Sequence, residues 1–316
     1  MSGHAIKRPV LLSDLSERVP YNIPELPIYA FRDPLSLYAD YRCACHWHRD
    51  LEFVHVISGA MQYFVNGVVH ELHAGEGLVV NSSRLHYGFS PQRHECWFAC
   101  AVISPSLIER LTSEVASRCG RAFDQHMDDC LRLSPEVLWQ REILHSIDQL
   151  VTQLHGERLD RVRQTSCDHT VNPLPAVATA IGLLDAVLDR FRPSADDDAD
   201  AFMERHRRID VLNMTGLIQQ RFAEPLSLED IAAAGNVSRT QCCLLFRCYV
   251  GHTPNEYLTE RRIEEAKRLL SQTDGAIAQI ARACGFASAS YFISVFRARM
   301  GVTPGMYRER QRNNGL

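Results

Sequence analysis

The feature that most constrains this chain is a pattern that occurs twice near its C-terminal end. The first copy contains Phe246-Arg247, Gly251, Thr253-Pro254 and Tyr257, and the second contains Phe296-Arg297, Gly301, Thr303-Pro304 and Tyr307. Upstream, Ile231-Ala232 matches Ile280-Ala281 and Ser238 matches Ser288, so the two copies differ by one residue in a turn. A repeat of this length indicates a duplicated supersecondary unit.

Each copy predicts two short helices joined by a tight turn. In the first copy, apolar residues at helical spacing predict a helix over 226–234, which Gly235-Asn236 ends before an N-cap at Ser238 and a helix over 239–249. In the second copy, a helix over 276–283 ends at Gly285, and Ser288 caps the next helix. That helix is expected to face inward through Tyr291, Phe292, Val295 and Phe296. Such a helix-turn-helix places its second helix in the major groove of DNA.

This C-terminal region resembles the double helix-turn-helix domain of the AraC/XylS family of bacterial transcription regulators. The resemblance rests on Gly285-Phe286, Ser290-Tyr291-Phe292, Phe296-Arg297, Gly301-Val302-Thr303-Pro304 and Tyr307-Arg308, and it covers about residues 210–310. It implies a transcription regulator rather than an enzyme, with helix-turn-helix motifs at about 226–249 and 276–300. Double-stranded DNA is the implied partner, RNA polymerase is a further one, and the implied location is the cytoplasm.

The register of the repeat predicts which side chains face DNA. They are Arg239, Thr240, Gln241, Leu244 and Arg247 in the first recognition helix, and Ala289, Ser290, Ile293, Ser294, Arg297 and Arg299 in the second. Gln241 suits adenine and Arg239 suits guanine or phosphate, whereas the later arginines suit phosphates, which position a protein without reading sequence. The second helix has fewer bidentate readers, so we expect it to discriminate less. The segment 254–271 predicts a connecting helix of about 27 Å.

The N-terminal half predicts an antiparallel β-barrel over about 35–105. Short β-branched runs occur at 51–57, 61–65, 68–72, 78–80 and 97–103, and Asn66-Gly67 is a strong signal for a type I′ hairpin. Many short strands separated by glycine-rich turns are typical of a barrel or jelly roll. The predicted fold is therefore a two-domain α+β chain, with a cupin-like barrel and flanking helices followed by an all-α domain.

A cluster of polar residues is predicted inside this barrel. His46, His48, Glu52 and Gly59 form an H-x-H-x3-E-x6-G string that resembles the first cupin motif, and His86 follows at a suitable distance. Alternate residues of a strand share a face, so these side chains are expected to point inward, where Tyr63 and Trp97 can line a pocket. In AraC-like sensor domains, which this region resembles, such a barrel holds a small-molecule effector.

Three interpretations of this cluster stay open. His46, His48, Glu52 and His86 suit a divalent transition metal such as Zn, Fe, Mn or Ni. The same residues can instead bind an effector, or simply satisfy one another in a polar core. The alternative function is a cupin-type metal-binding protein or metalloenzyme fused to a DNA-binding domain.

Two apolar helical stripes follow the barrel, at about 134–192. One runs from Val137 to Leu154 and the other from Leu174 to Phe191. The family resemblance implies that these helices form a homodimer, and the alternative is that both pack on their own barrel. The acidic stretch 193–202 predicts a flexible linker. It divides a sensor domain, 1–192, from a DNA-binding domain, 203–316, whose first helix is expected over 203–222.

Charge is distributed unevenly between these parts. Residues 203–316 carry sixteen Lys and Arg against eleven Asp and Glu, a net charge of +5, whereas the whole chain carries −4. A basic C-terminal part on an acidic body suits a polyanionic partner for that part alone. Residues 1–20 predict a loose arm. Neither a signal peptide nor a bilayer-spanning run is recognisable, and the scattered cysteines suit a reducing compartment, so no membrane association is expected.

Overall fold

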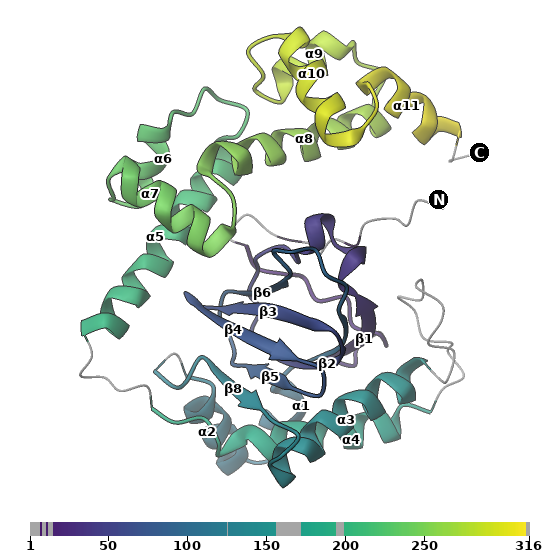
Figure 1. Ribbon diagram of the computed structural model, residues 1–316, viewed down its shortest axis with the longest axis vertical. Coiled ribbons are helices and arrows are strands. Elements are labelled where there is room, and N and C mark those ends of the chain that lie inside the picture. Colours follow the sequence, from purple (N-terminus) through teal and green to yellow (C-terminus); the bar gives the residue numbers. More distant parts are fainter. Residues whose placement is uncertain are drawn as a thin grey trace. The chain divides into compact units, whose positions relative to one another are not determined.

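The computed structural model (Figure 1) describes residues 15–124, 126–155, 172–193 and 199–313, together with Lys7 and Leu11. Its internal contacts divide the chain into two compact units, 1–205 and 206–316. Within the described ranges, no helix is both long enough and apolar enough to cross a membrane. The fold is two-domain α+β, with antiparallel sheets in the first unit and helices in the second.

Two antiparallel sheets form the body of the first unit. The larger has the strand order β1-β7-β2-β5-β8, and the smaller has the order β4-β3-β6. Their bounds are β1 Ile28–Pro34, β2 Leu51–Ser58, β3 Ala60–Val65, β4 Val68–His73, β5 Gly77–Val80, β6 His86–Phe89, β7 Trp97–Ile103 and β8 Cys130–Leu133. At the turn between β3 and β4, Asn66 and Gly67 both have positive φ, of 43° and 99°, which confirms the predicted hairpin.

The sheets extend beyond the predicted range of 35–105 at both ends. Strand β1 precedes that range and pairs with β7 along its whole length, while β8 follows it and pairs with β5. The sequence prediction missed both because β1 contains charged residues and a terminal proline, and because β8 is only four residues long. Pairing with neighbouring strands supplies the order that their local sequence does not specify.

Alternation along the central strands separates two cores. In β2, Val54 and Val56 join the core between the sheets, together with Tyr63 and Val65 of β3. Phe53, which precedes Val54, points to the other face, into a core shared with the helices. A half-buried strand places alternate side chains on opposite faces, and here both faces are covered. One core therefore lies inside the barrel-like body and the other lies outside it.

The helices of the first unit are α1 Ser106–Glu109, α2 Ser113–Ala122, α3 Leu138–His155 and α4 Leu174–Leu188, with short 3-10 turns η1 Leu35–Leu37 and η2 Ala39–Tyr41. Helices α3 and α4 lie side by side beneath the larger sheet (Figure 1). Most of both predicted stripes is buried against this sheet. In the second stripe Leu184, Val187 and Leu188 are buried inside the protomer, so only the remaining residues of α4 are available for the predicted homodimer, which stays a prediction.

The second unit is entirely helical among its described residues. Helix α5, Ala199–Arg221, begins before the boundary at 205/206 and continues into this unit. The later elements are α6 Leu228–Ala234, α7 Arg239–Leu245, the π-turn η3 Phe246–Val250, α8 Pro254–Gln272, α9 Ile277–Ala283, α10 Ala289–Met300 and α11 Pro304–Asn313. Helix α5 begins at Ala199, four residues before the expected start, which corrects the predicted linker 193–202. Ala199 and Ala201 are good helix formers, and Asp200 suits the first turn. The rest of that linker, 194–198, lies outside the described residues.

The turn between α6 and α7 and the turn between α9 and α10 share one hydrogen-bond pattern and differ by one inserted residue. The backbone N–H groups of Val237 and Phe286 each donate to the carbonyl five residues earlier. The residue before each has positive φ, 52° at Asn236 and 80° at Gly285. This is the hydrogen-bond pattern of a Schellman motif. Because the motifs align, the extra residue of the second copy is Ala287, between Phe286 and the capping Ser288.

Candidate DNA-binding surface and buried histidine cluster

The two recognition helices α7 and α10 start at the serines that the sequence predicted. The hydroxyl of Ser238 accepts a hydrogen bond from the N–H of Gln241, and that of Ser288 accepts one from Tyr291. An N-cap satisfies a backbone donor that a helix leaves unpaired, and it fixes where the helix begins. The register of the candidate DNA-facing residues is therefore set by these caps.

Most of the candidate DNA-facing side chains are exposed in the structure. The exposed ones are Arg239, Thr240, Leu244, Arg247, Ser290, Ile293, Ser294, Arg297 and Arg299. Leu244 is 56% exposed, which is unusual for a leucine in a packed helical domain and suits an apolar contact with a partner. Gln241 is half-buried.

Two residues of the second recognition helix differ from the prediction. Ala289 is half-buried, as Gln241 is, and packs against the core of α8, α9 and α10, so it is less exposed than predicted. Tyr291, predicted to face inward, is 55% exposed. Its ring lies edge-on to Phe286 with centroids 6.1 Å apart, which supports the side chain from the turn. The apolar stripe of α10 is narrower than its composition suggested, and its fully buried residues are Phe292 and Phe296.

Helix α8 joins the two helix-turn-helix motifs as one continuous element. Its 19 residues correspond to about 28 Å of helix. Thr253 and Glu256 form a capping box at its start, and Leu258 near that end is buried. Ile263, Ala266 and Leu270, further along, pack into the core of the second motif. Hydrogen bonds from Arg262 to the carbonyls of Phe222 and Glu224 tie α8 to the end of α5.

A buried polar cluster lies in the first unit at the predicted residues His46, His48, Glu52 and His86. One ligand-type atom from each lies within 4.8 Å of all the others. The Glu52 Oε2 atom is 3.2 Å from His86 Nε2, 3.3 Å from His48 Nε2 and 4.0 Å from His46 Nε2. Strand β2 positions Glu52 between β5 and β7. His46 lies outside the strands and pairs with His86, the first residue of β6, through an isolated β-bridge.

All three imidazoles are oriented in the same way. Each Nδ1 atom lies against a backbone carbonyl, at 2.8 Å from Ala44 for His46, 3.0 Å from Asp50 for His48 and 2.8 Å from Arg84 for His86. A carbonyl only accepts hydrogen bonds, so each Nδ1 carries the proton. In a neutral ring the lone pair then lies on Nε2. The three Nε2 atoms therefore present lone pairs to one shared space, unless a ring is protonated.

The charges in this cluster perturb one another strongly. Burial opposes ionisation of Glu52, but the charge of His86 and hydrogen bonds from His48 and His86 hold its pKa well below its usual value. Burial also disfavours the charged form of His48, yet the hydrogen bond and charge of Glu52 raise its pKa. Burial together with the charge of His86 lowers the pKa of His46 to about 3. The cluster thus holds a carboxylate that needs positive charge beside it.

The structure adds Glu17, which the sequence did not indicate. Its Oε2 atom lies 3.3 Å from His46 Nε2, and burial raises its pKa. The backbone N–H of Glu17 donates to the carbonyl of Trp47, and the N–H of Trp47 donates to Leu15. The expected loose arm 1–20 is therefore wrong for 15–17. This contact spans about 30 residues of chain, so no local pattern signals it.

The two aromatic residues predicted to line the site have different outcomes. The hydroxyl of Tyr63 donates to Glu52 Oε1, so Tyr63 joins the cluster. Trp97 does not join it. Phe98, Cys100 and Val102 of the same strand face the inner core, whereas Trp97 is on the opposite face and is 37% exposed. The prediction for Trp97 is wrong because strand alternation turns it to the other face of the sheet.

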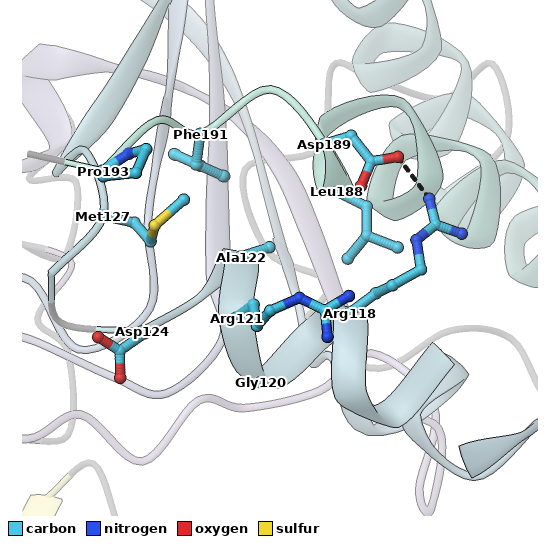
Figure 2. Close-up of a pocket in the computed structure, with 10 residues that line it drawn as sticks. All are labelled: Arg118, Gly120, Arg121, Ala122, Asp124, Met127, Leu188, Asp189, Phe191 and Pro193. Carbon is cyan, nitrogen blue, oxygen red and sulfur yellow. Dashed lines mark hydrogen bonds and ion pairs between the residues drawn. The ribbon is translucent and has the colours of Figure 1, made fainter. Parts of the chain in front are cut away.

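A separate surface cavity of about 540 Å³ lies in the first unit where α2 meets the end of α4. Figure 2 shows Met127, Phe191 and Leu188 around it, with Arg118 reaching Asp189 at 2.6 Å. The candidate effector residues do not line this cavity. Its lining carries two arginines, Arg118 and Arg121, and two aspartates, Asp124 and Asp189.

Comparison with protein families assigns both halves of the chain. Residues 36–168 match the family described as AraC-like ligand binding domain, and residues 231–310 match a helix-turn-helix domain family. The chain belongs to the AraC family of transcriptional regulators. It is thus a DNA-binding regulator with a ligand-binding domain, and its family is one of regulators rather than enzymes.

Two sequence relatives agree with this assignment. The chain is 26% identical over 307 residues to the uncharacterized HTH-type transcriptional regulator YdeC of Bacillus subtilis, covering 96% of this chain and 99% of that protein. It is 29% identical to the HTH-type transcriptional regulator ArgR of Pseudomonas aeruginosa, over 55% of this chain and 56% of the relative. Among solved structures, ToxT of Vibrio cholerae is similar at 17% identity, over 89% of this chain and 97% of that chain, with a TM-score of 0.34.

Proposed function

We propose that this protein is a sequence-specific regulator of transcription whose DNA binding responds to a small molecule held in the N-terminal unit. The observation that carries the DNA-reading half is the pair of serine-capped recognition helices with exposed Arg239, Leu244 and Arg247 on one, and Ser290, Ile293 and Arg297 on the other. Helix α8, about 28 Å long, suits a spacing near one DNA turn of about 34 Å between the helices.

The two kinds of contact have different expected consequences. Arg239 and Gln241 stand in the first turn of α7, where side chains of a recognition helix reach base edges. Arg247, Arg297 and Arg299 lie in the last turns of their helices and suit phosphates. Phosphate contacts supply affinity that weakens with salt, whereas base contacts supply discrimination.

The experiment is genomic footprinting of the full chain, followed by binding titrations on the recovered sites. Arg239→Ala is expected to weaken binding by about 1–3 kcal/mol and to relax preference at one base pair. Arg268→Ala is the matched control, because Arg268 is an exposed arginine of the same unit paired with Glu265 on α8. Equal losses of DNA affinity in both variants would show that Arg239 acts only through its net charge, and this would contradict a role in base reading.

The proposed effector site is the interior of the first unit at His46, His48, Glu52, Tyr63 and His86. Its support is the convergence of buried polar groups, because a binding site needs a few placed polar atoms within apolar walls. A ligand shifts DNA affinity only if it binds two states of the protein unequally. Operator affinity that is unchanged by every metal and compound tested would remove the sensing function while leaving DNA binding intact.

A homodimer is proposed through the outer face of α4. The family resemblance supports it, and Leu174 at the start of α4 is 70% exposed, with Val177 and Ile181 half-buried beside it. Ile181→Asp is expected to shift a dimer to monomer in sedimentation, whereas Asp185→Asn on the same helix is not. A wild-type chain that sediments as a monomer at all concentrations would contradict this proposal. Contact with RNA polymerase stays a prediction.

A further inference from the structure

The buried histidine cluster has an electrostatic arrangement that hydrogen bonding among its own members does not complete. Each Nδ1–H is already donated to a backbone carbonyl, so a neutral ring offers only the Nε2 lone pair. Those lone pairs approach Glu52 Oε2, which is also an acceptor, at 3.2–4.0 Å. Acceptors converging on acceptors in a buried space require a shared cation, because each would otherwise repel its neighbours.

A single proton satisfies only part of this arrangement. Protons on both His48 and His86 let two rings donate to Glu52 Oε2, but this places two charged rings with centroids 4.9 Å apart in a buried space and still leaves the Nε2 atom of His46 bare. A second carboxylate comes from Glu17 in the N-terminal segment 15–17, and its Oε2 atom lies 3.3 Å from His46 Nε2. One buried carboxylate, one partly buried carboxylate and three imidazoles match the charge and donor preferences of a divalent transition metal.

The groups behind the cluster are those that support metal ligands. Histidine ligands commonly donate their second N–H to a carbonyl, which holds the ring in place and fixes its tautomer. All three rings do so here. The second oxygen of Glu52 accepts from Tyr63, which leaves Oε2 facing the three imidazoles. Ligands held at about 2.0–2.2 Å from one ion lie about 3–4 Å from one another. The distances from Glu52 Oε2 to the three Nε2 atoms, 3.2–4.0 Å, fit this requirement, and all four ligand-type atoms lie within 4.8 Å of one another.

We propose that this cluster binds one divalent transition-metal ion through His46, His48, His86 and Glu52, and that Glu17 supplies a further carboxylate from the N-terminal segment. The inference deepens the proposed sensing function, because it gives the class of ligand for the same site. It also gives residues 15–17 a role, because their hydrogen bonds with Trp47 hold Glu17 at the proposed metal. Metal occupancy of the site and the position of this segment therefore depend on each other.

The test is metal analysis and titration of the full chain, produced without a polyhistidine tag. Purified protein is expected to retain about one transition-metal ion per chain. After chelation, added Co²⁺ is expected to give the visible absorption of a low-symmetry nitrogen and oxygen site. His86→Ala should abolish this spectrum, whereas His73→Ala, which removes an exposed histidine of β4, should leave it unchanged. Wild-type protein that binds neither Co²⁺ nor Zn²⁺ at stoichiometric amounts would overturn the inference without any variant.

Glu17 has its own test. Glu17→Gln is expected to weaken Co²⁺ binding by about tenfold or more, as loss of supporting groups at metal sites does. Glu25→Gln is the matched control, since Glu25 is an exposed glutamate nearby in sequence. Equal affinity in both variants would remove Glu17 from the site. A metal-free protein whose DNA affinity still responds to an organic compound would overturn the metal inference and leave the proposed function standing.

Discussion

The two helix-turn-helix copies use the same residues for structure and different residues for their surfaces. Phe246 lies 5.8 Å from Tyr257 between ring centroids, and the equivalent Phe296 lies 5.5 Å from Tyr307. Gly251 and Gly301 end the recognition segments with φ of 78° and 72°. The repeated pattern is thus a packing and capping framework. The positions between its members are free to differ, and they form the candidate DNA surface.

The copies also end differently. The N–H of Gly251 donates five residues back, to Phe246, because the first copy closes with the π-turn η3. The N–H of Gly301 donates four residues back, to Arg297, in a regular α-helical end. Such π-turns often occur at functional positions. Together with Ala287, this difference shows that equal sequence spacing does not produce identical backbones.

The largest expected effect tests whether the frameworks are equivalent. Phe296→Ala and Phe246→Ala each remove a fully buried ring, and each should lower the free energy of unfolding by about 3–5 kcal/mol. Urea denaturation followed by circular dichroism measures both. A loss below about 1 kcal/mol in one variant would show that its copy is held together by other contacts.

The turns provide a sharper comparison. Gly285→Ala should destabilise by about 1–3 kcal/mol, because the residue has φ of 80° and an added Cβ would lie 2.7 Å from the carbonyl oxygen of Phe222. Asn236→Gly, at the equivalent position, should be neutral or stabilising, since glycine accepts this conformation more readily. Gly275→Ala is the control, because an added Cβ there would lie 3.6 Å or more from its nearest neighbours, at ordinary contact distance. Thermal unfolding that shows equal losses at 236 and 285 would contradict the alignment of the two motifs.

The third comparison concerns DNA reading. Gln241→Ala should cost about 1–3 kcal/mol of binding at one preferred base pair, because an amide can make two hydrogen bonds to adenine. Ser290→Ala, in the second recognition helix, should cost less, since a hydroxyl accepts several bases. Titrations against sites with single base changes measure this difference. A larger loss of discrimination from Ser290→Ala would reverse the predicted roles of the helices.

The smallest expected effect is at the caps. Ser238→Ala and Ser288→Ala each remove one side-chain acceptor for a backbone N–H, and each should destabilise by about 1 kcal/mol. The Ser→Gly variants should lose only a few tenths of a kcal/mol of unfolding free energy. Matched unfolding curves would support equal caps, whereas a loss at only one serine would show that the other helix begins without its cap.

The sequence by itself determined the features that depend on neighbouring residues. Ser238, Ser288, Asn66-Gly67 and the repeated phenylalanines act within a few positions of themselves, so local chemistry specifies the caps, the hairpin and the helical framework. The H-x-H-x3-E string also indicated His46, His48 and Glu52 as a cluster.

Only the tertiary structure decided what depends on partners distant in the chain. Glu17 meets His46 because the segment 15–17 pairs with Trp47, and Trp97 leaves the site because of the face that β7 presents. Tyr291 is exposed although it neighbours the buried Phe292, and most of the α4 stripe is buried because α3 and α2 pack against it. Burial is a property of what packs against a residue, and periodicity cannot report which surface that is.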